Sequence, residues 1–359
     1  MPHSSDTNTL FSQAKLQPQS TQMEDFGSSQ IYLIDVPATS ANMGAGFDCF
    51  GIALQLYNRF VFRVMEDQPG ELVFRANFSL KQNPRTNLVY KAYRYTLDCI
   101  GFNGLPGIEV NVISEIPSAR GLGSSASAVV AGILAAGAIA GVNLRLSEAI
   151  EIATELEGHP DNVAPAILGG FTISTKDRNG VYSEKLDWPE ELAILVGIPD
   201  IKVRTQSARK VLPRNVSFED AVFNIQCASL FISALVKKDW RGLGIAMNDR
   251  LHQSARASLI PGLNRVLTAC RDSGAIGAVL SGSGPCILSV VAAANQHAIK
   301  SVSNAIQKSW RHVHIDSEVK QLQVQKHTTK IKRINQEEMD RIMEPHRDSF
   351  DHPNSSILI

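Results

Sequence analysis

The segment Pro117–Ser127 is the feature of this sequence that most constrains its fold. A β-like run precedes it and an alanine-rich helical run follows it. Gly121 and Gly123 allow positive φ and a close approach of the backbone, and the first N–H groups of the following helix face any anion there. The spacing therefore predicts a phosphate-binding loop, in which Ser124 and Ser125 can cap the helix or reach a metal ion.

Two structural interpretations compete with this one. The glycine and serine residues could simply cap a core helix, because short motifs of this kind also occur without a ligand. Residues 121–142 could also cross a membrane, since they carry no charge and contain the G-x-x-x-G pair Gly137 and Gly141. However, 12 of these 22 residues are Gly or Ala and three are Ser, which is weakly hydrophobic. The composition therefore favours a helix buried in a globular core.

The overall composition excludes several classes of protein. The 359 residues include 35 Lys and Arg and 35 Asp and Glu, so no net charge draws the chain to nucleic acid or to an anionic membrane. The five cysteines are scattered and form no C-x-x-C pair, so neither a disulfide framework nor a zinc site is indicated. We therefore expect a reducing, cytoplasmic location, with no nucleic-acid or membrane partner, and a homodimer is compatible with the sequence.

The two ends of the chain differ from the rest. Residues 1–30 are rich in Ser, Gln and Thr and contain neither Arg nor an apolar stretch typical of a signal peptide. We expect a disordered extension there and a frayed polar tail over 329–359. Between the ends, a break near Trp188–Glu191 divides the chain into a first domain over 31–187 and a second over 188–328.

The second half alternates strands with helices and contains a tight turn at Ser281–Pro285. Strands separated by helices in this way predict an α+β fold with a mixed or antiparallel sheet.

Two further segments of the first domain carry polar groups. We expect a first strand over 31–36 and a glycine-broken turn over 37–48. Asn42 and Asp48 lie in this turn, where the alternative is a simple hairpin corner. Glu151 lies in a helix over 148–156 and could equally point to solvent. His159 follows in a Gly-His-Pro turn, where a structural histidine is the alternative.

Together these segments resemble the galactokinase, homoserine kinase, mevalonate kinase and phosphomevalonate kinase superfamily, the GHMP kinases, and among them homoserine kinase. The resemblance spans about residues 31–325 in the family's order. The matching segments are Pro117–Ala126, Pro37–Asn42 with Gly46–Asp48, Glu157–Pro165, Thr205–Arg209, Asp249–His252 with Arg256, and Leu280–Pro285.

The resemblance implies a two-domain GHMP kinase fold, with an N-terminal domain similar to domain 2 of ribosomal protein S5 and a ferredoxin-like C-terminal domain. It implies transfer of the γ-phosphoryl group of ATP to the hydroxyl of L-homoserine, a step toward threonine, with Mg²⁺ as cofactor. Ser281–Gly284 would close the site from the second domain.

The resemblance also assigns roles to individual residues. For the phosphates of ATP these are Pro117, Ser118, Ala119, Arg120, Gly121, Leu122, Gly123, Ser124, Ser125, Ala126 and Ser127, with Asn87 near the adenine. Ser125 and Glu151 would hold Mg²⁺. The substrate-binding residues would be Asn42, Asp48, His159, Thr205, Arg209 and Arg256. Asn162 stands where other kinases of the superfamily have a catalytic aspartate, so it would orient the attacking hydroxyl.

The residue chemistry fits this assignment. Homoserine is a zwitterion, so its site needs an anion for the ammonium and a guanidinium for the carboxylate, and Asp48 and the arginines supply both. The chain has no G-x-x-x-x-G-K-[ST] motif, which excludes a P-loop kinase. It departs from the family at Gln253–Ala255, where Glu-Pro-Tyr is common.

Two other functional classes remain open at this stage. One is a sibling kinase for another alcohol such as mevalonate, which lacks an ammonium group. The other is a non-catalytic relative that only binds nucleotide.

Overall fold

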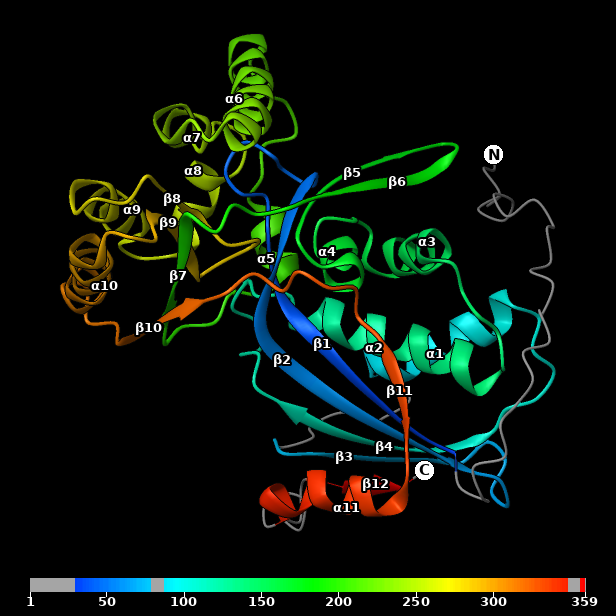
Figure 1. Ribbon diagram of the computed structural model, residues 1–359. Coiled ribbons are helices and arrows are strands. Elements are labelled where there is room, and N and C mark those ends of the chain that lie inside the picture. The colour runs from blue at the N-terminus through cyan, green and yellow to red at the C-terminus, as the bar shows by residue number, and fades with distance from the viewer. Residues whose placement is uncertain (1–29, 79–86, 348–355, 359) are drawn as a thin grey trace, which may run out of the picture.

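The computed structural model describes residues 30–78, 87–347 and 356–358, and these form two α+β units that pack side by side (Figure 1). Residues 1–29 of the expected extension lie outside the described residues. The first unit is built on an eight-stranded sheet and the second on a four-stranded sheet. This is the two-domain arrangement expected from the sequence.

The first sheet has the order β11-β1-β2-β4-β3-β12, and β5 pairs with both β2 and β6. Helices α1 to α4 cover one face of it (Figure 1). The strands are β1 (Ile31–Ala41), β2 (Phe50–Met65), β3 (Leu72–Ala76), β4 (Gly107–Ser114), β5 (Phe171–Asp177), β6 (Gly180–Leu186), β11 (Ile331–Ile334) and β12 (Ser356–Leu358), and the helices are α1 (Leu88–Cys99), α2 (Ser124–Ile139), α3 (Leu146–Glu157) and α4 (Val163–Leu168).

The second sheet is antiparallel with the order β10-β7-β9-β8. Numbered from β7, this is the order 4-1-3-2 of a ferredoxin-like domain. Its strands are β7 (Leu192–Pro199), β8 (Gly277–Leu280), β9 (Ile287–Ala292) and β10 (Ser317–Leu322), and its helices are α5 (Thr205–Lys210), α6 (Phe218–Lys237), α7 (Trp240–Ala246), α8 (Gln253–Arg256), the 3₁₀ turn η2 (Ala257–Leu259), α9 (Leu263–Asp272) and α10 (Gln296–Arg311).

One hydrophobic cluster joins the two domains. It contains Phe50 and Ile52 from β2, Val196 and Leu288 from the second sheet, and Phe231 from α6. The opposite face of the second sheet packs against α9 and α10 in a separate cluster. The joint cluster fixes the position of the second domain against β1 and β2, and this fixes the cleft between the domains.

Two expectations from the sequence were wrong. Pro37–Ala41 does not begin the turn but continues β1, pairing with β2 across a bulge. Residues 329–347 are not a frayed tail: β11 pairs antiparallel with β1, and the amphipathic helix α11 (Gln336–Met343, followed by the 3₁₀ turn Glu344–His346) buries Met339 beneath the first sheet. Residues 348–355 and 359 of the expected tail lie outside the described residues.

Helix α2 is buried on most sides, as its composition predicted. It has 16 residues and is too short for the span considered over 121–142. Among the described residues, α6 is the one helix that is long and apolar enough to cross a membrane, by length and composition alone. One face of α6 packs into the core of the second domain.

Candidate functional site

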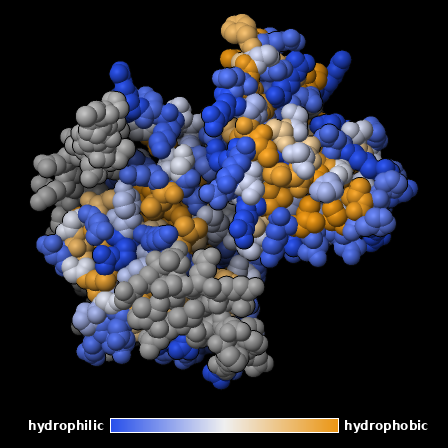
Figure 2. Space-filling model, turned by 180° about the vertical axis from the view of Figure 1, so that it is seen from behind, coloured by the Kyte–Doolittle hydropathy of each residue, from blue (hydrophilic) through white to orange (hydrophobic). Residues whose placement is uncertain are grey.

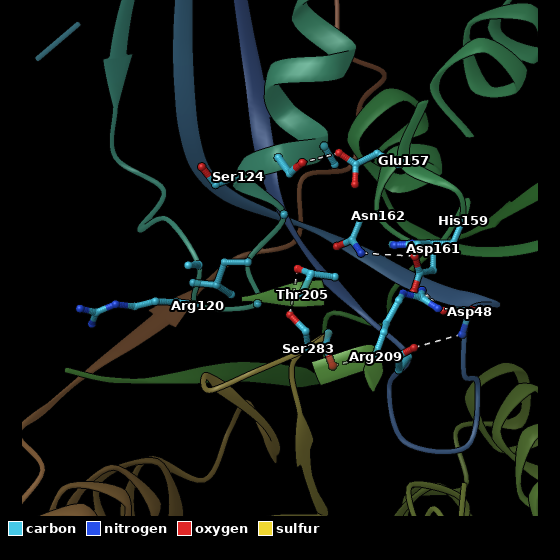
Figure 3. A pocket seen from close by; sticks show the side chains of 18 of the residues that line it. Asp48, Arg120, Ser124, Glu157, His159, Asp161, Asn162, Thr205, Arg209 and Ser283 are labelled. Carbon is cyan, nitrogen blue, oxygen red and sulfur yellow. Dashed lines mark hydrogen bonds and ion pairs between the residues drawn. The ribbon is translucent and has the colours of Figure 1, made fainter. Parts of the chain in front are cut away.

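A cleft lies where the two domains meet, at the start of α2 (Figure 3). The β4–α2 loop forms one wall, the α3–α4 connection a second, and α5 with the turn after β8 a third. The cleft is lined by Asn42, Asp48, Pro117, Ala119, Arg120, Gly121, Leu122, Gly123, Ser124, Ser125, Ala126, Glu157, His159, Asp161, Asn162, Thr205, Arg209, Arg256, Gly282 and Ser283.

The N-terminus of α2 opens into this cleft. Gly123 is its N-cap residue with φ 72°, no side chain caps the helix, and its first turn has no acidic residue. Gly121 has φ 78°, and a Cβ atom there would lie 2.2 Å from the Ser281 carbonyl oxygen. Both glycines are therefore required by the backbone, and the N–H groups of the first turn stay available to an anion.

Not every residue of the predicted phosphate loop faces the cleft. Ser127 is fully buried; its hydroxyl donates to the Ser124 carbonyl at 2.9 Å and accepts from Asn58 Nδ2 at 2.8 Å. Ser118 is exposed and does not line the cleft. The prediction that these two residues contact phosphate is therefore not supported by the structure.

Arg120 lines the cleft, but its guanidinium serves the domain interface. Nη1 donates to the Pro199 carbonyl at 2.7 Å and Nη2 to Asp200 Oδ1 at 2.7 Å. Asn87 lies outside the cleft lining and caps α1, with Oδ1 accepting from the Val89 N–H at 2.8 Å. Its proposed contact with adenine remains a prediction.

The structure brings Ser125 together with Glu157 and not with Glu151. The Ser125 hydroxyl donates to Glu157 Oε1 at the mouth of the cleft (Figure 3). Glu151 Oε1 lies near Gly180 at the β5–β6 turn, 3.1 Å from where a Cβ of that glycine would be. Glu151 lies six residues before Glu157, about one and two-thirds turns back and on another face of α3, so it does not meet Ser125 here, and its assignment to Mg²⁺ stays a prediction. The missed signal was the acidic residue directly before Gly158, where α3 ends.

The far end of the cleft holds an ion pair between the two domains. Arg209 Nη2 lies 2.7 Å from Asp48 Oδ1 and Nη1 lies 3.1 Å from Oδ2. Both side chains are about one third exposed. Asn42 Oδ1 accepts the Asp48 N–H at 3.0 Å and its Nδ2 donates to the Gly282 carbonyl at 3.0 Å, so it fixes the turn that presents this carboxylate.

Arg256 lies deeper than Arg209. It is 2% exposed, donates from Nη1 to the Gly282 carbonyl at 2.9 Å, and lies 3.1 Å from His252 Nδ1. Burial, and then the charge of Arg209, lower the pKa of Arg256. Both guanidiniums lie over the ring of Phe47, at 5.8 Å for Arg209 and 5.4 Å for Arg256. The two predicted carboxylate ligands therefore converge on one ring from separate helices.

A chain of hydrogen bonds leads from His159 to Thr39 on β1. His159 Nδ1 bonds to Asp161 Oδ1, and Asn162 Nδ2 lies 3.3 Å from the same oxygen. Asn162 Oδ1 accepts from Thr39 Oγ1 at 2.9 Å, a contact that sequence reasoning did not find. Burial disfavours a charged His159, but the hydrogen bond and charge of the buried Asp161 outweigh it, so its pKa is raised.

The remaining predicted residues also lie in the cleft. Thr205 Oγ1 is 3.3 Å from Ser283 Oγ, so α5 and the turn after β8 meet at the opening. Ser281 anchors that turn, since its hydroxyl donates to the Gly121 carbonyl at 2.6 Å. At the departure from the family pattern, Gln253 Oε1 accepts the Leu280 N–H at 2.7 Å and thereby supports Arg256 on its short helix.

The chain matches two family models. The description "GHMP kinases N terminal domain" applies to residues 87–170 and "GHMP kinases C terminal" to residues 231–312. The first range contains the β4–α2 loop and the α3–α4 connection.

Similar proteins cover nearly the same length. A homoserine kinase of Halothermothrix orenii is 38% identical over 291 residues, which is 80% of this chain and 92% of that protein. A homoserine kinase of Aquifex aeolicus is 42% identical over 275 residues, covering 77% of this chain and 92% of that protein. The crystal structure of homoserine kinase from Cytophaga hutchinsonii has a TM-score of 0.76 at 28% identity and covers 87% of this chain and all of that one.

Proposed function

The chain belongs to the homoserine kinase family of the GHMP kinases, and we propose that it transfers the γ-phosphoryl group of ATP to the hydroxyl of L-homoserine, a step toward threonine. One observation carries this proposal. A single cleft joins an uncapped helix N-terminus at one end to a carboxylate and two guanidiniums at the other. The first end suits phosphate and the second suits an amino acid.

The phosphates would bind at the start of α2. The N–H groups that follow Gly123 face them, and the backbone of Ala119–Gly123 is held open by its bonds to the second domain. We propose that Ser125 and Glu157, rather than Ser125 and Glu151, hold Mg²⁺, because hydroxyl and carboxylate oxygens are the ligands that this ion prefers. When bound, the ion would neutralise charge on the transferring phosphoryl group.

The charged side chains at the far end of the cleft match the charges of homoserine. The Asp48 carboxylate can take the ammonium group, and Arg209 with Arg256 can take the carboxylate. Asn42 would fix the position of Asp48, and Thr205 lies beside the arginines at the opening. His159, whose pKa is raised by Asp161, would hold the Asp161 carboxylate away from the ammonium site.

Asn162 would position the attacking hydroxyl. An amide does not accept a proton at neutral pH, and its Oδ1 already accepts from Thr39. Its Nδ2 group can donate to the hydroxyl oxygen as that oxygen attacks phosphorus. The bond between phosphorus and the β–γ bridging oxygen breaks, ADP leaves, and the hydroxyl proton passes to a phosphoryl oxygen.

A panel of truncated substrates tests the proposal. Homoserine, 4-hydroxybutyrate without the ammonium group, 3-aminopropanol without the carboxylate, and mevalonate would be compared by coupled ADP release. We expect turnover with homoserine, and a loss of kcat/KM of at least roughly 100-fold for each truncated analogue, because each leaves a charged group unpaired. Faster turnover of mevalonate would mean a sibling kinase, and nucleotide binding without turnover of any alcohol would mean a non-catalytic relative.

We also propose a cytoplasmic location without nucleic-acid partners. The support is the balanced charge and the five free cysteines, of which Cys227, Cys270 and Cys286 are buried. Burial raises the pKa of the Cys270 thiol to about 11, so this cysteine is an unreactive core residue.

A further inference from the structure

Polar side chains are buried where β1 ends at the cleft. In contrast, some hydrophobic side chains gather on the surface of the second domain (Figure 2). Thr39 and Ser40 are fully buried, and Asn42, which directly follows the strand, is 2% exposed. A buried polar group costs free energy unless it has a hydrogen-bond partner, so the partners of these three side chains show what their burial serves.

Thr39 differs from its two neighbours in what it contacts. The side chains of Ser40 and Asn42 bond to the turn after β8, in the second domain. The hydroxyl of Thr39 instead donates to Asn162 Oδ1 at 2.9 Å. Thr39 is therefore the member of this group that bonds to the residue we assign to the acceptor hydroxyl.

Thr39 also meets the start of α2. Its backbone N–H donates to the Leu122 carbonyl at 3.1 Å, and a Cβ atom at Gly123 would lie 2.0 Å from Thr39 Oγ1. The hydroxyl thus lies directly beside the loop where we place the phosphates, while it bonds to Asn162 at the start of α4. One residue of β1 therefore links the phosphate end of the cleft to the amide.

The neighbours of Asn162 fix the orientation of its amide. A threonine hydroxyl can donate or accept, so it does not select one orientation by itself. An ionised carboxylate can only accept, and Asp161 Oδ1 lies 3.3 Å from Asn162 Nδ2. Nδ2 therefore takes the Asp161 side, and Oδ1 accepts from Thr39. The opposite orientation would set the amide oxygen against the carboxylate oxygen.

This orientation leaves one N–H of the amide for the cleft. One hydrogen of Nδ2 faces Asp161, and the second can donate to the acceptor hydroxyl, since Asn162 lines the cleft between the start of α2 and the ion pair at the far end (Figure 3). We propose that Thr39 is a positioning residue for phosphoryl transfer: it holds the Asn162 amide with Nδ2 toward the acceptor hydroxyl and at a fixed place relative to the phosphates. This role rests on the proposed function.

Replacing Thr39 by valine tests the role of its hydroxyl. Valine has a similar branched shape, so the packing of β1 and the backbone bond to Leu122 should remain. We expect kcat to fall by roughly 5- to 15-fold, with KM for ATP and for homoserine changed by less than about twofold, because Oδ1 loses its donor and the amide can turn. Thr39→Ser keeps a hydroxyl and should retain at least about half of the wild-type kcat.

A double-mutant cycle with Asn162 separates positioning from a structural role. If Thr39 acts through the amide, Thr39→Val should slow an Asn162→Ala enzyme by less than about twofold, although it slows the wild-type enzyme by roughly 5- to 15-fold. A purely structural role would slow both enzymes by the same factor, because the strand and the loop would be disturbed with or without the amide.

Thr96→Val is the matched control. Thr96 lies on α1 and is fully buried, and its hydroxyl donates to the Ala92 carbonyl of the same helix at 2.8 Å. The same chemical change at this position should leave kcat and both KM values within about twofold of wild type. The melting temperature of every variant shows whether a loss of kcat comes from unfolding.

Three outcomes would overturn the role of Thr39. They are a Thr39→Val enzyme with wild-type kcat, an equal loss in the wild-type and Asn162→Ala backgrounds, and a Thr39→Ser enzyme as slow as Thr39→Val. A wild-type chain that does not phosphorylate homoserine would refute the proposed function itself. That result needs no variant, so the two failures are distinguishable.

Discussion

Replacing Glu157 by glutamine should slow phosphoryl transfer strongly, while the same change at Glu151 should have almost no effect. Both glutamates lie on α3, and both substitutions keep the size of the side chain while removing its charge. Only Glu157 meets the Ser125 hydroxyl in the cleft, whereas Glu151 lies by the β5–β6 turn. Both variants remove one carboxylate from α3, so comparing them tests whether the position of that carboxylate matters.

The expected magnitude follows from the surroundings of Glu157. Its side chain is partly exposed, so an effective dielectric constant of about 20 applies, and two unit charges about 4 Å apart then interact by roughly 4 kcal/mol. The amide oxygen of glutamine still coordinates a cation, which retains part of this energy. We expect a loss of about 2–3 kcal/mol in the transition state, or a fall in kcat of roughly 30- to 150-fold. For Glu151→Gln we expect less than about a twofold change, as for most surface substitutions.

The assay is a titration with Mg²⁺ at saturating ATP and homoserine, with melting temperature as the control for folding. The Glu157→Gln variant should need more Mg²⁺ and still not reach wild-type kcat, and Ser125→Ala should move both values in the same direction. Our reasoning fails if Glu157→Gln is fully active or if Glu151→Gln is the slower enzyme. The second result would show that α3 rotates about its axis, or that Glu151 binds Mg²⁺ when nucleotide is present, as the family resemblance implies.

Three more predictions follow from the same site. Arg209→Met and Arg256→Met should each raise the KM for homoserine by roughly 30-fold or more, about 2 kcal/mol, with KM for ATP little changed; equal damage to both constants would indicate a folding defect. In single-turnover experiments Asn162→Ala should be about 10- to 100-fold slower and Asn162→Asp no faster than wild type, and a faster Asn162→Asp would show that a carboxylate base is wanted. The raised pKa of His159 means that its pair with Asp161 stabilises the protein fully below the unfolded value of about 6.5 and less as pH rises through the folded value. The difference in melting temperature between wild type and His159→Gln should therefore shrink with rising pH, and a constant difference would contradict the pair.

The conformation of the β4–α2 loop could be predicted from sequence because its constraint is local. Two glycines and a helix start lie within a few residues, and their φ values of 78° and 72° are what the spacing required. The same holds for α2, whose composition indicated burial. In contrast, Asp48 and Arg209 are 161 positions apart, and no periodicity relates them. Only the resemblance to a known family joined them before the structure did.

Two placements could not be predicted from the sequence, each for a physical reason. A helix of unknown rotation does not tell which glutamate faces a ligand, so Glu151 and Glu157 could not be separated by composition. The strand β11 is polar on one side and short, and its partner β1 lies some 300 residues earlier, so the pairing Ile31 with Ile334 leaves no local trace. Both cases concern tertiary placement, which local propensity does not encode.

The ion pair between Asp48 and Arg209 means that these two charges in the cleft neutralise each other when no ligand is bound. A zwitterion that binds there trades one ion pair for two, each of its ends taking one member of the original pair. The number of charges of each sign stays balanced throughout, so the exchange should depend only weakly on ionic strength. A ligand with a single charge would pair with either Asp48 or Arg209 and leave the other residue without a counter-ion. If Asp48 and Arg209 bind the substrate as we propose, the preference for an amino acid with no net charge follows from the number of ion pairs formed and broken.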